Sequence, residues 1–329
     1  MGILEGKAAV VTGGGRGVGR GECLHLAAQG AAVVVNDVDG EEAQKVVGEI
    51  RDAGGRAAAS SADIGTRKGA QELVAQCVDE FGAIHAVVNN AGIVRDKSFL
   101  KMTDEEWEIV LRIHAGGTFW CAQEAALRMR DQGTGGAIVN TVSAAQMGNF
   151  GQTNYGAAKG AIASMTYTWA NELARYGIRV NAISPMATTR MSATFKGADG
   201  KPAANAPFFD PNLNGPFVAY LCSDEASWIT GQVFGTGADR VVIMKHPTYD
   251  TGMFKPGGWD VEALRDQMPK FWKGRLEPVG LYKKPYPYYE GVKFASPAQR
   301  AEGERSPVGG KCTWASLRCS TRFPTASPR

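Results

Sequence analysis

Three residues in the middle of the chain have the types and spacing for acid–base chemistry on an alcohol. Tyr155 and Lys159 lie four residues apart, so on a helix their side chains stack on one face. A tyrosine, whose ordinary pKa is about 10, is a poor base at neutral pH. A neighbouring ammonium favours the phenolate, so we expect Lys159 to lower the pKa of Tyr155 and let it take an alcohol proton. Ser143, twelve residues before Tyr155, can hold the substrate oxygen by a hydrogen bond.

A glycine-rich run, Thr12–Gly19, indicates a nucleotide site. It reads TGGGRGVG and lies between a short apolar run and a helix-like stretch. Glycines let the backbone turn tightly and approach a pyrophosphate, whose charge is favoured at a helix N-terminus. The predicted cofactor contacts in this run are Gly13, Arg16, Gly17, Val18 and Gly19. With a dinucleotide beside Tyr155, the predicted chemistry is hydride transfer between an alcohol or ketone and a nicotinamide ring. The positive ring of the oxidised cofactor would act with Lys159 in lowering the pKa of Tyr155.

Asp37 bears on the choice between NAD and NADP. It ends the second apolar run, about 20 residues past the glycines, where a carboxylate binds the adenosine ribose hydroxyls and repels a 2′-phosphate. Arg16 is a counter-signal, because an arginine in the glycine run can bind a 2′-phosphate. Asp37 also fits a simple turn that ends at Gly40. We give Asp37 more weight and predict NAD as the cofactor.

Two more polar segments follow the third and fourth apolar runs. Open α/β sheets bind their ligands at the carboxyl ends of the strands, where these segments are expected to lie. Each segment alone also fits a turn, but their placement at successive strand ends favours a cofactor role. The predicted contacts here are Asp63, Ile64, Asn90, Ala91 and Gly92.

Short apolar runs alternate with helix-length amphipathic stretches and would position these residues. The predicted strands are Ala8–Thr12, Ala32–Asn36, Ala57–Ala59, Ala86–Asn89, Gly136–Thr141 and Arg179–Ile183. The predicted helices are Gly17–Gln29, Glu41–Ala53, Arg67–Phe81, Asp104–Met129 and Tyr155–Tyr176. Nearly continuous apolar strands are typical of a parallel sheet covered on both faces. The alternation therefore predicts a doubly wound α/β fold.

The sequence changes character after Pro185. Residues Met186–Pro216 are rich in Ala, Gly, Asn and Pro and predict a mobile loop, of a length that often serves as a lid. Beyond it we expect a helix at Phe217–Ser223, a last strand at Gly231–Gly235 and one more helix at Val261–Trp272. The predicted divisions are a catalytic domain over 1–245, an aromatic and Pro-rich extension over 246–300 and a disordered tail over 301–329.

Composition argues against several classes of protein. A net charge of +3 over 329 residues is too small for a dedicated nucleic-acid binder. No apolar run approaches the roughly 20 residues that span a bilayer, and the N-terminus does not resemble a signal peptide, so we expect a cytoplasmic protein without a membrane partner. The six cysteines form no CxxC pair and the four histidines lack metal-ligand spacing, which predicts free thiols and no metal.

The motifs together resemble those of the short-chain dehydrogenase/reductases. The resemblance rests on TGxxxGxG at Thr12–Gly19, NNAG at Asn89–Gly92, Ser143, and YxxxK at Tyr155–Lys159, and it spans about residues 5–245. It implies a single Rossmann-type domain, a nicotinamide cofactor and a homodimer or homotetramer.

The same resemblance implies roles for particular residues. Asn89 and Gly92 would border the cofactor, and Tyr155 and Lys159 would contact it, Lys159 through the nicotinamide ribose. Thr188 would touch the carboxamide.

His114 departs from the family pattern. The family usually has a fourth catalytic residue, an Asn, in the helix before the serine, and here the corresponding run is Ile113–Gly117 with His114 in that place. We include His114 among the predicted catalytic residues, where it could hold a water of the proton relay and make activity more sensitive to pH. The alternative is a packed helix histidine. Two later motifs also differ, since Met186 follows Pro185 where Gly is usual, and Gly235–Asp239 replaces Asp-Gly-Gly.

Three segments are similar to the dehydrogenase part of peroxisomal multifunctional enzyme type 2, a group that includes 17β-hydroxysteroid dehydrogenase type 4. They are His114, Gly148–Tyr155 and Thr189–Met191. The similarity implies NAD⁺-dependent oxidation of (3R)-hydroxyacyl-CoA thioesters or hydroxysteroids. Two alternatives stay open. An NADPH-dependent 3-oxoacyl or carbonyl reductase is disfavoured by Asp37, and a non-catalytic nucleotide-binding protein is disfavoured by the intact serine, tyrosine and lysine.

We expect three segments to wall the substrate pocket: Ala144–Phe150, the Met186–Pro216 loop and the aromatic extension around Tyr249–Tyr289. Side chains that would suit a bulky apolar substrate, or would serve as ordinary packing, are Gln146, Met147, Phe150, Phe195, Phe208 and Phe209. The extension either covers the pocket or clasps a neighbouring subunit. We favour the second, because aromatic segments fixed by proline dock at low entropic cost.

Overall fold

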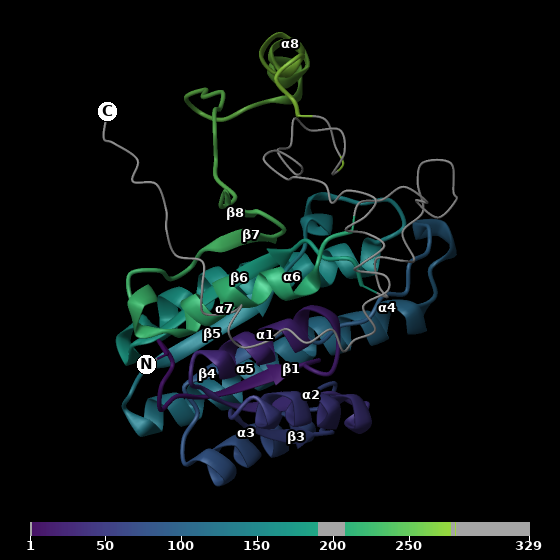
Figure 1. The fold of residues 1–329 in the computed structure, drawn as a ribbon. Coiled ribbons are helices and arrows are strands. Elements are labelled where there is room, and N and C mark those ends of the chain that lie inside the picture. Colours follow the sequence, from purple (N-terminus) through teal and green to yellow (C-terminus); the bar gives the residue numbers. More distant parts are fainter. Residues whose placement is uncertain (1, 190–207, 278–279, 281–329) are drawn as a thin grey trace.

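The apolar runs of the sequence form the strands of one sheet. The computed structural model describes residues 2–189, 208–277 and 280. Its strands are β1 (Ala8–Thr12), β2 (Ala32–Asn36), β3 (Arg56–Ser60), β4 (Ala86–Asn89), β5 (Gly136–Thr141), β6 (Ile178–Pro185), β7 (Val233–Gly237) and β8 (Arg240–Met244). They lie in the order β3-β2-β1-β4-β5-β6-β7-β8 (Figure 1), parallel except for β8. The predicted doubly wound, mainly parallel sheet is confirmed.

Alternate residues of the strands face two layers of helices. Val11 and Val33 pack with α1 (Gly17–Ala28), α2 (Gly40–Asp52) and α7 (Gly215–Cys222) on one face of the sheet. The neighbouring Val10 and Val34 pack on the other face, whose helices are α3 (Arg67–Phe81), α5 (Gly117–Gln132) and α6 (Thr153–Leu173). Both faces are apolar because a parallel sheet is covered on both sides. The chain crosses from β3 back to β4, so the strand order reverses beside β1, where open sheets of this kind bind dinucleotides.

The helix predicted over Asp104–Met129 is interrupted. The structure has α4 (Asp104–Leu111), a π-helical turn (Arg112–Gly116) and then α5. A Thr103 capping box starts α4. The wider turn places His114 inside the molecule, and at Gly117 a Cβ would come within 2.4 Å of Ile64 Cδ1. An amphipathic period alone does not reveal such a turn, which is common at functional sites.

The end of the sheet differs from the prediction. The strand expected at Gly231–Gly235 begins two residues later, as β7. β8 was not predicted, and it pairs antiparallel with β7 across a turn at Ala238, whose φ is 49°. In this five-residue strand the apolar Val241 and Ile243 are exposed and Arg240 is buried, so polar and apolar residues do not alternate with burial and give no clear pattern.

The extension leaves the sheet at β8 and contains the predicted helix, α8 (Val261–Trp272). Of the predicted loop Met186–Pro216, both ends are described, and a 3₁₀ turn at Pro211–Asn214 precedes α7. The loop residues 190–207, including Phe195, lie outside the described residues, as do Tyr282–Tyr289 and the predicted disordered tail.

Four cysteines are buried and free, as predicted, namely Cys23, Cys77, Cys121 and Cys222. Cys312 and Cys319 lie outside the described residues. Over residues 2–189, 208–277 and 280, every helix is too short or too polar to span a bilayer. Within those ranges no three His, Cys, Asp or Glu side chains gather as a metal site requires.

Candidate active site

The glycine run forms a tight turn between β1 and α1 that only glycine allows. Gly13 and Gly17 have φ of 64° and 55°, in the left-handed region. A Cβ at Gly19 would lie 2.2 Å from the Gly13 carbonyl oxygen. The first turn of α1 thus exposes its amides without intervening side chains, and a nucleotide pyrophosphate fits such a cradle. Predicted members Gly13, Gly17, Val18 and Gly19 all lie in it.

Asp37 faces the glycine run from the end of β2. Its Oδ2 accepts a hydrogen bond from Gly15 N at 3.2 Å, and its Oδ1 accepts one from Asp39 N at 3.0 Å. Arg16, the counter-signal for NADP, donates to Asp39 at 2.5 Å and to Glu42 at 3.0 Å. Two carboxylates therefore bind the Arg16 guanidinium, and a third, Asp37, bonds the adjacent Gly15.

Asn90 joins β4 to the glycine run. Its Nδ2 donates to Thr12 O at 3.0 Å and to Gly13 O at 3.1 Å. Thr12 Oγ1 in turn accepts from the backbone of Asn90 and Ala91. Both amide hydrogens of Asn90 are thus used inside the protein. Asn90 was predicted to contact the cofactor. The structure shows that it holds the glycine run, the segment predicted to bind the pyrophosphate, in place.

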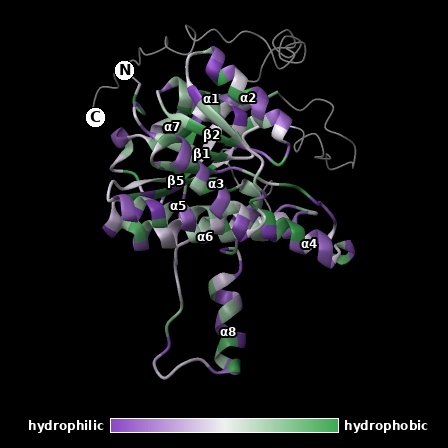
Figure 2. Cartoon of the chain, turned by 90° about the horizontal axis from the view of Figure 1, so that it is seen from below, coloured by the Kyte–Doolittle hydropathy of each residue, from purple (hydrophilic) through white to green (hydrophobic). Residues whose placement is uncertain are grey.

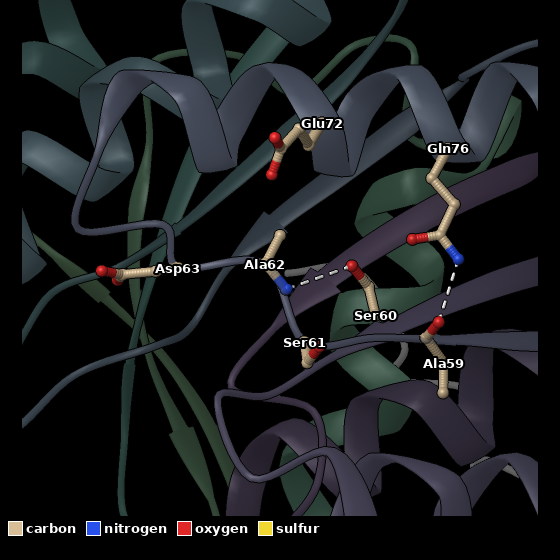
Figure 3. A pocket seen from close by; sticks show the side chains of 7 residues that line it. All are labelled: Ala59, Ser60, Ser61, Ala62, Asp63, Glu72 and Gln76. Atoms are coloured by element: carbon tan, nitrogen blue, oxygen red, sulfur yellow. Dashed lines mark hydrogen bonds between the residues drawn. The ribbon is translucent and has the colours of Figure 1, made fainter.

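Asp63 and Ile64 lie at the carboxyl end of β3, as predicted. Asp63 Oδ1 accepts from Gly65 N at 2.9 Å, and Ile64 is buried under α5. Beside them, between β3 and α3, is a groove of about 420 Å³ (Figure 3). In Figure 3 the Asp63 carboxylate points away from Glu72 and Gln76, and Gln76 Nε2 donates to Ala59 O at 2.9 Å.

Thr188 closes the base of the long loop after β6. Its backbone N–H donates to Phe209 O at 2.8 Å, and its Oγ1 accepts from Phe209 N at 2.9 Å. The next residue, Thr189, comes within 3.4 Å of the Cβ position of Gly17. The structure therefore brings the predicted Thr188 segment against the glycine run.

Three of the four predicted catalytic residues meet at the carboxyl edge of the sheet. Ser143 follows β5, and its side chain lies close enough to that of Tyr155 on α6 to favour the phenolate. One turn along α6, Lys159 is buried and its Nζ donates to Thr141 O at 2.5 Å. Lys159 Nζ lies 5.6 Å from the centre of the Tyr155 ring. A substrate oxygen held by the Ser143 and Tyr155 hydroxyls would face the same edge as the glycine run.

Burial controls the ionisation of this group. Burial raises the pKa of Tyr155 to about 12, although the hydrogen bond to Ser143 favours the phenolate. Burial also lowers the pKa of Lys159 to about 7. Lys159 by itself therefore does not bring the pKa of Tyr155 below its ordinary value, because removal of water disfavours both charged forms. The predicted lowering by Lys159 and the nicotinamide ring together concerns the cofactor complex and stays a prediction.

His114 is buried beside Tyr155. Its Nε2 lies 2.7 Å from Ile93 O and 3.0 Å from Ile93 N, so either neutral tautomer bonds the same residue. The ring meets that of Tyr155 edge to face at 5.2 Å, and Nδ1 is buried without a partner. Burial lowers the pKa of His114 to about 3. The ring is neutral at physiological pH, so the expected pH sensitivity does not come from its titration.

Sequence reasoning missed the residue that fixes the start of α6. Asn154 donates to Arg95 O and to Glu106 O, both at 2.9 Å, and its Oδ1 accepts from Tyr155 N at 2.7 Å. It thereby ties the tyrosine's backbone to α4. An Asn just before an expected helix was the available signal, because Asn favours helix N-termini.

A chain of buried amides lies behind the lysine, and it too was missed. Asn89 of β4 donates to Asn140 of β5 at 3.0 Å, and Asn140 donates to Thr166 of α6 at 3.0 Å. Asn89, predicted to border the cofactor, thus uses its Nδ2 within the sheet. This chain holds β4, β5 and α6 together below the catalytic residues.

The segment after Ser143 contacts both ends of the extension. Gln146 Nε2 lies 2.9 Å from Met244 Sδ at the end of β8. The Cβ position of Gly148 lies 3.7 Å from Gly280 Cα, beyond α8. Phe150, which was expected to line the substrate pocket, is exposed among the described residues.

A family model described as short chain dehydrogenase matches residues 7–199, more than half of the chain. The protein is a short-chain dehydrogenase. Short-chain dehydrogenases are oxidoreductases that use a nicotinamide cofactor, NAD or NADP, so the family predicted from the motifs is confirmed.

This short-chain dehydrogenase is similar to several known proteins, one of which is named as a hydroxyacyl-CoA dehydrogenase. Hydroxyacyl-CoA dehydrogenase ChsB1 of Mycobacterium tuberculosis is 39% identical over 287 residues, covering 83% of this chain and 90% of that protein. Peroxisomal multifunctional enzyme type 2 of Mus musculus is 37% identical over 244 residues, covering 71% of this chain and 32% of the longer protein. A crystal structure of a short chain dehydrogenase from Mycobacterium avium has a TM-score of 0.76 and 36% identity, and covers 84% of this chain and 98% of that one.

Proposed function

We propose that this short-chain dehydrogenase uses NAD(H) to interconvert a secondary alcohol and a ketone on a 3-hydroxyacyl-CoA or hydroxysteroid-like substrate. The observation that carries the reaction type is the meeting of Ser143, Tyr155 and Lys159 at the sheet edge that also holds the glycine run. We also propose a cytoplasmic homodimer or homotetramer, since closed homo-oligomers are the commonest assemblies of soluble enzymes.

The residues of the site have different roles toward the substrate oxygen, namely binding it, exchanging its proton and stabilising the resulting charge. The Ser143 and Tyr155 hydroxyls hold the substrate oxygen between them. In reduction Tyr155 donates its proton to that oxygen, and in oxidation it takes the alcohol proton. Lys159, held on Thr141 O, places its amine near the Tyr155 ring, where its protonated form would stabilise a phenolate. The nicotinamide, when bound, supplies the carbon that accepts or donates the hydride.

The charges around Arg16 support NAD. Asp39 and Glu42 occupy its guanidinium, and Asp37 lies beside them on the glycine run. A 2′-phosphate would have to displace these ion pairs and would meet the remaining carboxylates. Ribose hydroxyls, in contrast, donate well to a carboxylate.

The substrate class draws its support from the named relatives and from the segment before Tyr155. ChsB1 is called a hydroxyacyl-CoA dehydrogenase, and it matches this chain over most of both lengths. In the Gly148–Gln152 segment, Gly148 and Gly151 have positive φ, and Gln152 Nε2 donates to Asp96 at 3.1 Å. This braced segment leads from the edge of the sheet into α6 and so lies beside the substrate oxygen.

A turnover screen tests the proposal. NAD⁺ and NADP⁺ are each offered with 3-hydroxyacyl-CoA esters, hydroxysteroids and simple cyclic alcohols, and NAD(P)H formation is followed by absorbance. We expect turnover with NAD⁺ on the first or second class, and a loss of at least 100-fold in kcat for Tyr155→Phe with NADH binding retained. Full turnover by Tyr155→Phe would falsify the assigned chemistry.

A second variant tests the cofactor choice by itself. Asp37→Ala removes the carboxylate that repels a 2′-phosphate, so the ratio of kcat/KM for NAD⁺ over NADP⁺ should fall at least tenfold. Glu49→Ala removes a carboxylate further along α2 and should leave this ratio unchanged. An unchanged ratio in Asp37→Ala contradicts the role given to Asp37.

A further inference from the structure

Helix α8 carries an apolar stripe that its own chain covers only in part, since Leu264, Phe271 and Trp272 are half-buried and Val261 and Met268 are exposed. No residue of α8 is buried, and Val261 and Met268 are 66% and 43% exposed. The apolar side chains recur at a spacing that places them within one third of the helix circumference; they are Val261, Leu264, Met268, Phe271 and Trp272. The opposite side carries charged residues such as Glu262 and Lys270. A stripe of this width ordinarily packs against another element.

Residues 245–260, which we call the stalk, connect β8 to α8 and hold the helix away from the sheet. The start of the stalk is fixed by contacts with the body of the protein. Figures 1 and 2 show α8 standing apart from the layers of the sheet and its helices. At the base, the His246 ring lies 4.6 Å from that of Tyr167 on α6, and Met244 contacts Gln146. The stalk therefore starts from a defined place on the body rather than from a free end.

A second apolar strip lies where the stalk begins. Val241 and Ile243 of β8 are 52% and 63% exposed. Because strand side chains alternate, the two lie on the same face. β8 is also the last strand of the sheet, and its outer edge has no partner strand among the described residues. In Figure 1, β8 and α8 lie at the same end of the molecule, so both surfaces are available to one partner.

The charge of the extension indicates what kind of partner this is. Residues 249–277 contain five acidic and five basic side chains. A surface that binds nucleic acid or an anionic lipid layer would have a basic excess, and this one has none. Balanced charge around an apolar stripe instead suits a protein surface of the same composition, which a two-fold related copy provides.

The extension also belongs to the enzyme itself. Residues 1–245 make up about three quarters of the chain, so the alignments covering 83% and 84% of it reach into the extension. In the Mycobacterium avium structure that alignment takes in 98% of the chain, so a matching part of the extension is present in another short-chain dehydrogenase. A second copy of the same chain is a partner that every protein with this extension has available.

We propose that α8 docks on a second copy of this chain through the stripe Val261, Leu264, Met268, Phe271 and Trp272, next to the exposed strip of β8. The inference concerns assembly and does not depend on the substrate or the cofactor. It places the extension between subunits, while Met244 and Gly280 keep its two ends on the Gln146–Gly148 segment of its own subunit.

Two neighbouring residues of α8 provide a matched test in the full chain. Met268→Glu puts one negative charge on the stripe, and Gln267→Glu puts the same charge beside it, off the stripe. Sedimentation velocity over a wide range of concentrations should show that Met268→Glu weakens the association by tenfold or more. Gln267→Glu should keep the association constant of the unaltered protein. Equal association by the two variants overturns the proposal.

Hydrogen exchange gives an independent readout that needs no variant. In the unaltered protein, the amides of α8 should become more protected as concentration rises and the larger species forms. Protection that is the same at every concentration would mean that α8 is covered by its own chain or by nothing, and would also overturn the proposal. Neither measurement requires turnover, so failure of the proposed activity leaves the test intact.

Discussion

At the scale of single residues, His114 shows how burial changes a side chain's chemistry. Its ring bonds Ile93 and packs on Tyr155, so we expect it to place the tyrosine ring and not to exchange protons. The His114 ring signals in NMR spectra, assigned by comparison with His114→Phe, should not titrate between pH 5 and 8, because burial lowers the pKa to about 3. A titration midpoint inside that window would contradict this description.

Gly92 leaves the space that the buried His114 ring occupies. A Cβ at this position would lie 2.1 Å from His114 Cε1. We expect Gly92→Ala to displace the His114 ring, to cost roughly 1–3 kcal/mol of unfolding free energy and to lower kcat. Gly160, inside α6, has open space around its Cβ position, so Gly160→Ala should instead stabilise the helix by up to about 1 kcal/mol. Urea unfolding of both variants makes the comparison, and equal effects would refute it.

At the scale of elements, the contact between α1 and α7 contains a carboxyl group without partners. Both oxygens of Glu22 are buried and unbonded, and burial raises its pKa to about 8. Between pH 4.5 and 8 the folded protein keeps this proton and the unfolded chain loses it. Stability therefore falls as pH rises through that window, by roughly 4–5 kcal/mol in all.

Removal of the titrating group should remove this dependence. From pH 5 to pH 8, Glu22→Gln is expected to lose several kcal/mol less unfolding free energy than the unaltered protein, as measured by urea titration. Glu72→Gln changes the same charge on the exposed side of α3 and should follow the unaltered protein. Parallel curves for all three proteins would show that Glu22 is solvated or paired.

Elements whose hydrophobic pattern matches their burial were predictable from the sequence. Elements whose pattern also fits another structure, or does not match their burial, were not. The buried runs of β1, β2 and β4 were predicted to the residue, because a strand covered on both faces is apolar throughout. The π-helical turn before α5 was hidden, because its residues also fit an ordinary helix. β8 was hidden because its exposed side chains are apolar and its pairing depends on a turn with a strained Ala238.

The same distinction holds inside the site. Ser143, Tyr155 and Lys159 could be found because their types and spacing follow from the chemistry itself. The place of Asn154 before a helix signalled a capping role but not its bond to Arg95, and nothing signalled Thr141, because both contact residues far away in the sequence. The raised pKa of Tyr155 in the protein alone could not be predicted, because the cost of burial depends on what surrounds the ring, which spacing does not reveal.

At the scale of the whole molecule, the glycine run, Asp37 and Thr188 come from separate parts of the sheet, so a ligand that binds all three should stabilise the fold. At about 100 times its Kd, a nucleotide adds about 2.7 kcal/mol, or a rise in Tm of roughly 5–10 °C. We expect NAD⁺ to give this rise, and NADP⁺ at the same concentration to give less. Differential scanning fluorimetry checks the order, and a larger rise with NADP⁺ would reverse the assignment of the cofactor.

The hydrogen-bonded line from Asn89 through Asn140 to Thr166 has a consequence for how the chain finds its fold. In any arrangement that separates β4 from β5, these amides would be buried without partners, at about 1–3 kcal/mol for each lost group. Apolar side chains alone accept many neighbours, so they discriminate poorly between rival strand orders. The amides penalise misfolded sheets at the pairing of β4 with β5, the first two strands of the second half of the sheet, and so favour the native strand order.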